Sequence, residues 1–412
     1  MNKEIERQID RATEEFRRIL VEQYERNEKM AGGADGMACD AGADDADAVD
    51  AGGAGKVVIG LAPGDGIGPV IMDETRAVLG QLLEEELGGG RIELRDITGF
   101  TIEERRAAGE TVPASVIAQL EQCDVLLKGP TTTPNAAMGG KNLESANVFL
   151  RKRFDLFANV RPVKIEGKGI DWTFFRENTE GEYALGSTGI RVGYLDDDCQ
   201  AADVTAGRGL SVDFKVTTSE GSRRIAKAAY DFARENGKKR VSIVTKANIM
   251  KKTDGDFQAI ALDVAKDYPE ITTDTWFVDI MAANLVNKDI RSGFEVFVLP
   301  NLYGDIITDE AAQIQGGVGT AGSANIGTDI AMFEAIHGSA PRMVEDGIAH
   351  LANPASLMTA AVMMLRHIGY VDKAAQLEKA IAAADEKIGA EMTGLPGGRT
   401  CKEFADLVRA AL

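Results

Sequence analysis

The stretch EVFVLPNLYGDIITDEAAQIQ, residues 295–315, joins a short apolar run to a segment with helical spacing. The run VFVLP predicts a buried strand, and the residues that follow it predict the start of a helix. A strand that leads directly into a helix is the repeating unit of α/β proteins. This stretch therefore favours an α/β fold with a largely parallel sheet.

The same alternation recurs on both sides of this unit. Between the apolar runs lie helical patterns such as SRRIAKAAYDFARENGKK, residues 222–239. Further strands are predicted at KVVIGLA (56–62), RIELRDI (91–97), DVLLKG (124–129) and RVSIVTK (240–246). The alternation therefore indicates an α/β protein with a largely parallel sheet, and the chain contains no internal repeat.

Two segments depart from the alternation before the sheet begins, and one interrupts it later. In residues 1–30, apolar side chains recur at helical spacing and predict one amphipathic helix that packs on something: Ile5, Ile9, Ala12, Phe16, Ile19 and Leu20. Residues 31–55 are almost all Gly, Ala and Asp, which predicts a flexible acidic linker. Residues 186–216 are strand-like and rich in turns, which predicts a small accessory element.

The bulk composition excludes several classes of function. The chain has 412 residues, 44% of them hydrophobic, and a formal net charge of -19, so a non-specific nucleic-acid binder is not expected. Its N-terminus is dense in both charge signs, and no apolar run is long enough to span a membrane. Four scattered cysteines and three histidines argue against a zinc site. We expect a cytoplasmic protein that binds neither nucleic acid nor membrane.

Asp305 and Asp309 stand four residues apart, about one helical turn, so their carboxylates share one face of the predicted helix. Their position after a buried strand suggests half of a metal site. The alternative is a helix-capping Asp309 with Asp305 as an ordinary loop acid. Spacing alone leaves both interpretations open.

Three arginines lie beside apolar runs, where a guanidinium is costly unless it meets an anion. Arg151 sits in an apolar helical pattern, Arg161 follows FANV, and Arg176 follows WTFF. A ligand with several carboxylates would supply the anions, and guanidinium groups bind carboxylates with two parallel hydrogen bonds. Internal salt bridges within this acid-rich chain are the alternative.

The glycines of LAPGDGIGP, residues 61–69, invite comparison with a dinucleotide-binding loop. Their spacing, G-x-G-x-G followed by Pro69, lacks the third glycine of the Rossmann pattern. We therefore interpret Gly64, Gly66 and Gly68 as a tight strand-to-helix turn.

From about Lys56 to its end, the chain resembles the β-decarboxylating dehydrogenases, the isocitrate and isopropylmalate dehydrogenase family. Within that family it is most similar to the isocitrate dehydrogenases. The motifs occur in order along the chain: PGDGIGP, KGPTTTP, SANVFLR with RP ten residues on, FRENTEGEY, TKANIMK, NLYGDIITDEAA, GSANIG and FEAIHGSAP. The resemblance implies a large cofactor-binding domain (56–156 and 316–412), a small substrate and metal domain (157–185 and 217–315) and a clasp-like element at 186–216.

For the substrate, the resemblance implies oxidative decarboxylation of isocitrate to 2-oxoglutarate and CO₂. Arg151, Arg161 and Arg176 would hold its carboxylates, with Ser145 and Asn147 on the carboxylate that distinguishes isocitrate from isopropylmalate. The same reaction on homoisocitrate or 3-isopropylmalate is an alternative. Glu144 precedes Ser145, and isopropylmalate enzymes have an acid near that position. A non-catalytic regulatory subunit of the same fold is a further alternative.

For the chemistry, the resemblance implies a homodimer with shared active sites. Asp305 and Asp309 would bind Mg²⁺ or Mn²⁺ together with Asp279 of the partner subunit. Lys246 would assist removal of the hydroxyl proton, Tyr183 would protonate the enolate carbon, and Asn248 would lie near the nicotinamide and substrate.

For the coenzyme, the resemblance points to a set of binding residues in two loops and one later position: Thr133, His337, Gly338, Ser339, Ala340 and Asn353. NAD-using relatives often carry an acid where this chain has Arg342, and a base there can favour the 2′-phosphate of NADP. The C-terminal tyrosine and arginine of bacterial NADP enzymes have no clear match here. We expect NAD, with NADP as the alternative.

Overall fold

The computed structural model describes residues 3–34, 55–133, 143–185, 189–192, 209–317 and 321–412. Most of the predicted linker (31–55), and most of the accessory element (186–216), therefore lie outside the described residues. Among the residues that are described, no helix combines the length and apolar character needed to cross a bilayer.

Ten strands form one sheet in the order β2-β1-β3-β12-β11-β4-β5-β10-β8-β9. The neighbours of β11 and β4 run antiparallel to them, and the other pairs are parallel, so the predicted largely parallel sheet is confirmed. The strands are β1 (Val57–Ala62), β2 (Ile92–Asp96), β3 (Val125–Lys128), β4 (Ala158–Ile165), β5 (Ile170–Glu177), β8 (Arg240–Thr245), β9 (Thr272–Phe277), β10 (Val296–Leu299), β11 (Gly322–Ile326) and β12 (Ala331–Ala335).

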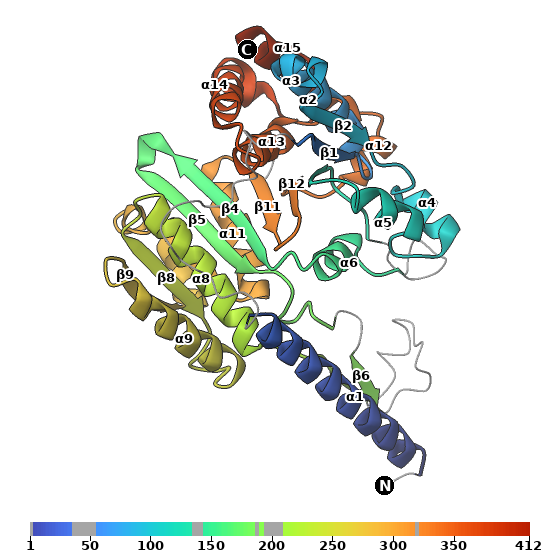
Figure 1. The fold of residues 1–412 in the computed structure, drawn as a ribbon, viewed down its shortest axis with the longest axis vertical. Coiled ribbons are helices and arrows are strands. Elements are labelled where there is room, and N and C mark those ends of the chain that lie inside the picture. The colour runs from blue at the N-terminus through green and yellow to red at the C-terminus, as the bar shows by residue number, and fades with distance from the viewer. Residues whose placement is uncertain (1–2, 35–54, 134–142, 186–188, 193–208, 318–320) are drawn as a thin grey trace.

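Helices follow most of the strands, as the alternation predicts (Figure 1). They are α2 (Gly68–Leu82), α3 (Glu84–Gly88), α4 (Ile102–Ala108), α5 (Ala114–Leu120), α6 (Ala146–Arg153), α8 (Ser219–Glu235), α9 (Thr253–Val264), α10 (Val278–Val286), α11 (Asn301–Gln315), α12 (Pro341–Glu345), α13 (Ala355–His367), α14 (Val371–Ile388) and α15 (Cys401–Ala411). The predicted helix at 222–239 is α8, which begins three residues earlier because Thr218 caps it by accepting a hydrogen bond from the Gly221 amide.

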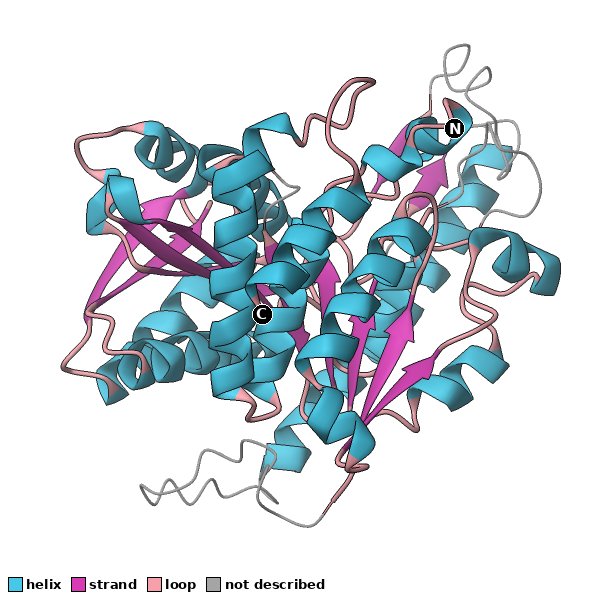
Figure 2. Ribbon diagram, turned by 90° about the horizontal axis from the view of Figure 1, so that it is seen from above, coloured by secondary structure: helices cyan, strands magenta, loops and turns pink. Residues whose placement is uncertain are grey.

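Helices cover both faces of the half-sheet made by β5, β10, β8 and β9 (Figure 2). On one face, Phe175 of β5 packs with Ile225 and Tyr230 of α8. On the other, Phe174 of β5 packs with Ile307 of α11. Successive residues of a strand point to opposite faces, so neighbouring side chains at the end of β5 lie in two different environments. A separate core joins α2, α13, α14 and α15 to β1, β3 and β12. The predicted division into two domains stays a prediction.

The predicted N-terminal helix is confirmed as α1 (Lys3–Ala34), which extends four residues into the predicted linker. It packs on α8 and on β6 (Ile190–Val192), which pairs antiparallel with β7 (Leu210–Val212).

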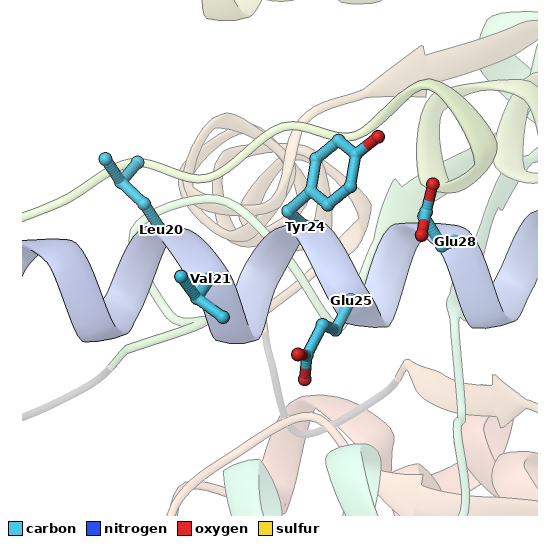
Figure 3. A pocket seen from close by; sticks show the side chains of 5 residues that line it. All are labelled: Leu20, Val21, Tyr24, Glu25 and Glu28. Carbon is cyan, nitrogen blue, oxygen red and sulfur yellow. The ribbon is translucent and has the colours of Figure 1, made fainter.

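The predicted inward stripe of α1 is only partly correct. Ile19 is buried and Phe16 stacks on Phe214 with ring centroids 5.4 Å apart, but Ile9, Phe16 and Leu20 are exposed. Leu20 belongs to a shallow hollow on the outer face of the helix, and Figure 3 shows the side chains that line it: Leu20, Val21, Tyr24, Glu25 and Glu28. Helical spacing alone could not tell which apolar side chains would find a partner within the chain.

Candidate active site

Four of the predicted substrate, metal and proton-transfer residues lie at one edge of the sheet. Strands β5, β10, β8 and β9 are parallel neighbours, so their carboxyl ends meet there. Arg176 lies near the end of β5 and Asp305 follows β10, while Lys246 follows β8 and Asp279 follows β9. The carboxyl edge of an α/β sheet is where such proteins bind ligands.

Arg176 is fully buried on the α11 face of β5. Its Nε and Nη2 donate to Asn301 Oδ1 at 3.0 and 2.7 Å, and its Nη1 donates to Asp305 Oδ1. Gly304 makes room for this side chain, because a Cβ there would lie 2.5 to 2.6 Å from the arginine stem. Burial, together with the positive charge of Arg151, lowers the pKa of Arg176 to about 9.

Arg161 approaches the same helix from β4. Its Nη1 donates to Thr308 Oγ1 at 2.6 Å and to Asp309 Oδ1 at 3.0 Å. Burial lowers the pKa of Arg161, and Asp305 and Asp309 offset that effect in part. The two aspartates therefore do share one face of α11, and within this chain they face two guanidinium groups.

Arg151 on α6 meets a buried acid that the sequence analysis missed. Its Nη2 donates to Glu334 Oε1 at 3.4 Å, and Lys128 Nζ lies 3.0 Å from Glu334 Oε2. Asn325 Nδ2 donates to the same Oε1 at 2.8 Å. Burial raises the pKa of Glu334, but Lys128 and Arg151 outweigh it and hold this pKa at about 2. The acid is therefore a fixed negative charge between two cations.

A signal for this acid was present in the sequence. Lys128 ends the apolar run VLLK, and Glu334 interrupts the apolar run AMFEA. Charged groups inside such runs need partners, and the parallel register places Lys128 directly beside Glu334.

Tyr183 lies against both Arg176 and Asp305. Its hydroxyl donates to Asp305 Oδ2 at 2.8 Å, and the Arg176 guanidinium lies 5.3 Å from its ring centroid. Burial and the charge of Asp305 raise the pKa of Tyr183. Burial also raises the pKa of Asp305, but Arg176 and Arg161 outweigh it, so this pKa lies below its ordinary value. The pair holds a protonated phenol beside a carboxylate.

Lys246 Nζ donates to Asp279, and this bond lowers the pKa of Asp279. The Lys246 amide donates to the buried Asp254 Oδ2 at 2.7 Å, which fixes the start of the TKANIMK segment. Asn248, two residues on, is exposed. The structure thus brings Lys246 and Asp279 together at the strand ends, in a pair separate from the carboxylates of Asp305 and Asp309.

Ser145 and Asn147 lie at the start of α6. Ser145 caps the helix, with its Oγ accepting from the Val148 amide at 3.5 Å, and Asn147 Oδ1 accepts from Thr131 Oγ1 at 2.9 Å. Both side chains are partly exposed, and they lie on the helix that carries Arg151.

Three loops meet on the other side of the candidate site. The Asp65 amide donates to Pro130 O at 2.7 Å, and Thr132 Oγ1 lies 2.7 Å from Ser339 Oγ. Gly66, with φ +62, lies so close to Ser339 that a Cβ would come within 1.9 Å of its carbonyl oxygen. The glycine turn is therefore a packing junction, as its spacing suggested, and it supports the loop that contains Ser339.

The remaining predicted coenzyme residues surround this junction. Thr133 is exposed next to Thr132, and Gly338 and Ala340 flank the buried Ser339. Asn353 Oδ1 accepts from the Ala355 amide at 2.9 Å near the start of α13. Arg342 is exposed on the short helix α12.

His337 has one ring nitrogen available at the same loop. Its Nδ1 lies 3.0 Å from Gly338 O, and its buried Nε2 has no hydrogen-bond partner among the described residues. Burial lowers the pKa of His337, so the ring is neutral and can exchange one hydrogen bond with a ligand. This group fits a polar coenzyme.

The two aspartates of α11 have donor chemistry that suits a hard divalent cation, because carboxylate oxygens are the ligands such ions prefer. Within the described part of the chain, no group of three or more His, Cys, Asp or Glu side chains forms a metal-binding cluster. Asp305 and Asp309 therefore fit such an ion only as a partial set, to which a further ligand must be added.

Comparison with known proteins agrees with this geometry. Residues 58–408 match the family model described as isocitrate/isopropylmalate dehydrogenase. The chain is 36% identical over 365 residues, 87% of this chain and 88% of the relative, to a probable mitochondrial isocitrate dehydrogenase [NAD] subunit alpha of Drosophila melanogaster. It is 38% identical over 329 residues, 78% of this chain and 62% of the relative, to an isocitrate dehydrogenase [NADP] of Rickettsia prowazekii.

A solved structure of similar fold is the isocitrate dehydrogenase from Methylococcus capsulatus. It superposes with a TM-score of 0.73 at 34% sequence identity, over 86% of this chain and 99% of that chain. The family model covers most of the chain, and the large, mostly parallel sheet with its many helices agrees with it. This chain therefore belongs to the isocitrate/isopropylmalate dehydrogenase family.

Proposed function

We propose that this chain catalyses the metal-dependent oxidative decarboxylation of isocitrate to 2-oxoglutarate and CO₂, with NAD as the hydride acceptor. Three buried arginines carry this proposal: Arg151, Arg161 and Arg176, which lie close enough together for the charge of Arg151 to lower the pKa of the other two. Arg151 and Arg161 each keep a buried Nε without a hydrogen-bond partner among the described residues. Buried guanidinium groups with spare donors suit a ligand that brings several carboxylates.

Isocitrate is favoured over 3-isopropylmalate by the polar start of α6. Ser145 and Asn147 can hydrogen-bond a third carboxylate, whereas an isopropyl group would leave these polar groups unpaired. The printed names of the relatives from Drosophila melanogaster and Rickettsia prowazekii, both isocitrate dehydrogenases, support the same choice.

Asp305 and Asp309 would hold Mg²⁺ or Mn²⁺ together with Asp279 of the partner subunit. A divalent ion bound there supplies Lewis acidity that polarises the carbonyl of the oxidised substrate. Arg161 and Arg176 hold the two α11 carboxylates in place. The bound coenzyme supplies the hydride acceptor, and His337 Nε2 and Ser339 lie in the loop that would bind it.

Two residues of this chain would move protons. Lys246 would assist removal of the hydroxyl proton, held at its amide by Asp254. Tyr183 would return a proton to the carbon that loses CO₂. A proton donor must be protonated before it acts, and the raised pKa of Tyr183 meets that requirement at neutral pH.

A homodimer with shared sites follows from the assignment of Asp279. Three apolar side chains on the neighbouring helices α10 and α11 are exposed, and contact with a second copy of the chain would cover them: Ile280, Val286 and Ile306.

The decisive test is an initial-rate absorbance assay at 340 nm that crosses three substrates with both coenzymes. Isocitrate, homoisocitrate and 3-isopropylmalate are each combined with NAD or NADP, with Mn²⁺ or a chelator. We expect turnover of isocitrate with NAD that the chelator abolishes. Turnover of 3-isopropylmalate alone would refute the substrate, and no turnover with any combination would favour a regulatory subunit.

The metal assignment has a matched pair of variants. Asp309→Asn should raise the Mn²⁺ concentration for half-maximal rate by at least about tenfold, because one charged ligand is lost. Glu310→Gln removes a charge from the next position of the same helix and should leave the Mn²⁺ requirement unchanged. Equal effects of the two variants would contradict a metal-binding role for Asp309.

The coenzyme assignment is tested at Arg342. Arg342→Glu should leave the rate with NAD within about twofold of the wild-type rate, since the 2′-hydroxyl of NAD needs no cation. If NADP is the natural coenzyme instead, the same variant should reduce kcat/KM for NADP strongly.

A further inference from the structure

Helix α1 reaches the loop that carries Tyr183, although it lies before residue 58, where the match to the family model begins. Arg26 Nη2 donates to Thr179 Oγ1 at 3.0 Å, and Arg26 Nη1 lies 3.6 Å from Glu180 Oε1. Thr179 and Glu180 stand between Arg176 and Tyr183 in the sequence. An arginine from the N-terminal helix therefore contacts the segment that connects two residues of the candidate site.

We propose that Arg26 is a positioning residue for the loop 177–183, and that helix α1 thereby acts on the proton-transfer step at Tyr183. The inference rests on the proposed function, because it assigns a consequence to the position of Tyr183. It adds a part of this chain that the family match does not include.

The contact of Arg26 differs from an ordinary surface ion pair. The side chain of Glu180 is only 3% exposed, and that of Arg26 is 29% exposed. Glu180 lies beside a second buried acid, Glu177, and burial together with Glu180 raises the pKa of Glu177 to about 7. Solvent screens the attraction between Arg26 and these buried acids less than it screens an exposed ion pair. Removal of Arg26 should therefore loosen the loop that contains them.

The loop is also connected directly to the substrate-binding arginine. Asn301 Nδ2 donates to the backbone oxygen of Glu180 at 2.9 Å, while Asn301 Oδ1 accepts both bonds from Arg176. Glu180 is held on its other side by the Thr218 amide at 2.8 Å and by the Thr218 hydroxyl. A shift of Glu180 would therefore move the partner of Arg176 as well as Tyr183, three residues further on.

The same helix offers a matched control. Arg18 pairs with Glu15 and Glu22 of its own helix, and all three side chains are exposed. Arg26 lies seven residues after the buried Ile19, so it shares the inward face, opposite the hollow of Figure 3. Removal of either arginine changes the charge of α1 equally, but only Arg26 contacts the loop.

The first readout is independent of activity. Amide hydrogen exchange of residues 177–183 is compared in the full-length wild type, Arg26→Ala, Arg26→Lys and Arg18→Ala. We expect exchange in this loop to be at least about threefold faster in Arg26→Ala than in the wild type. The rate in Arg26→Lys should lie between these two, and the rate in Arg18→Ala should equal that of the wild type. Unchanged loop exchange in Arg26→Ala, or the same change in Arg18→Ala, would overturn the inference.

The second readout asks whether the loop contact reaches the chemistry. With isocitrate, NAD and Mn²⁺, Arg26→Ala should lower kcat about fivefold and KM should stay within about twofold, because a displaced proton donor slows a step after binding. The exchange of the product's carbon-bound protons with deuterated solvent, which needs the same proton transfer in reverse, should slow by the same factor. An unchanged kcat with faster loop exchange would overturn the catalytic part.

The outcomes separate this inference from the proposed function. If the wild type turns over no substrate, the proposed function fails, and loop exchange alone decides whether Arg26 positions residues 177–183. If the wild type is active and Arg26→Ala matches it in both readouts, the inference fails and the proposed function stands.

Discussion

Two buried acids in the ten-stranded sheet have opposite surroundings. Glu334 lies between Lys128 and Arg151, and its pKa is held at about 2. Glu177 lies beside Glu180, and its pKa is raised to about 7. Both side chains are almost fully buried, so burial alone does not decide whether such a group is charged. The charge of the nearest neighbours decides it.

The two acids belong to regions with different chemistry. The cationic cluster consists of Lys128, Arg151, Arg161 and Arg176 with the acids Glu334, Asp305 and Asp309. The acidic loop consists of residues 177–183. Arg176 and Glu177 are consecutive in β5, so their side chains point to opposite faces, one toward the cationic cluster and one toward α8. One strand end thus carries a cation on one face and an acid on the other.

The largest expected effect follows the removal of Arg176 from the cationic cluster. Arg176→Met leaves Asp305 and Asn301 without their buried donor, so kcat/KM for isocitrate should fall by about 10³-fold or more, about 4 kcal/mol. Steady-state kinetics measure the loss, and Arg176→Lys should recover part of it. Arg153→Met, an exposed arginine that pairs with Glu121, is the control. A fall of less than tenfold in kcat/KM for Arg176→Met would contradict a substrate-binding role for Arg176.

The next effect concerns the stability that Glu334 contributes. Its folded pKa lies below the ordinary value of 4.5, so its contribution is full above pH 4.5 and is lost as the pH falls toward 2. Glu334→Gln should therefore cost about 3 kcal/mol at pH 7, and about half of that gap should remain at pH 3.

Urea unfolding at the two pH values measures this gap. Glu121→Gln, which removes an exposed acid from a surface pair with Arg153, should change the unfolding free energy by less than about 0.5 kcal/mol. A gap in Glu334→Gln that stays constant between pH 7 and pH 3 would contradict the low pKa of Glu334.

The smallest effect has the opposite sign and belongs to the acidic loop. The folded pKa of Glu177 lies above 4.5, so the folded state loses stability as the pH rises from 4.5 through about 7. Glu177→Gln lacks this loss and should gain about 2 kcal/mol relative to the wild type as the pH rises from 5 to 8. Glutamine has one acceptor oxygen, whereas Glu177 accepts bonds from the Thr179 and Glu180 amides through both oxygens, so the variant also carries a cost that is the same at every pH.

Thermal melting of wild type and Glu177→Gln across this pH range tests the sign. Glu235→Gln, an exposed acid of α8, should show no trend with pH. A relative loss of stability in Glu177→Gln at pH 8 would show that Glu177 is charged and favourable in the folded protein, and the contrast between the two acids would then disappear.

Much of the fold could be predicted because its signals are local. The runs that became β1, β3, β8 and β10 are short and rich in apolar residues, and the helix at 222–239 has a clear apolar period. The inward face of α1 was less predictable. Its apolar residues spread over more than one face, and contacts with α8 and β6 selected Ile19 over Ile9 and Leu20.

The candidate site could be predicted in its residue types and only partly in its partners. Arg161 and Arg176 were expected to meet anions, and within this chain they meet Asp309 and Asp305, the same carboxylates that were expected to bind metal. The internal salt bridges of the alternative interpretation are thus present, and the binding of a substrate or a metal ion by these residues stays a prediction. Lys128 and Glu334 were overlooked because their charges stand inside apolar runs.

The sequence by itself determined the alternation of strands and helices, the spacing of Asp305 and Asp309 on one helical face, and the family resemblance. Tertiary structure alone decided which groups became neighbours. Arg176 and Asp305 are 129 residues apart, and Arg26 and Thr179 are 153 residues apart. Local periodicity carries no information about pairs so distant, because their contact depends on the order of strands in the sheet and on the helix that packs on each face.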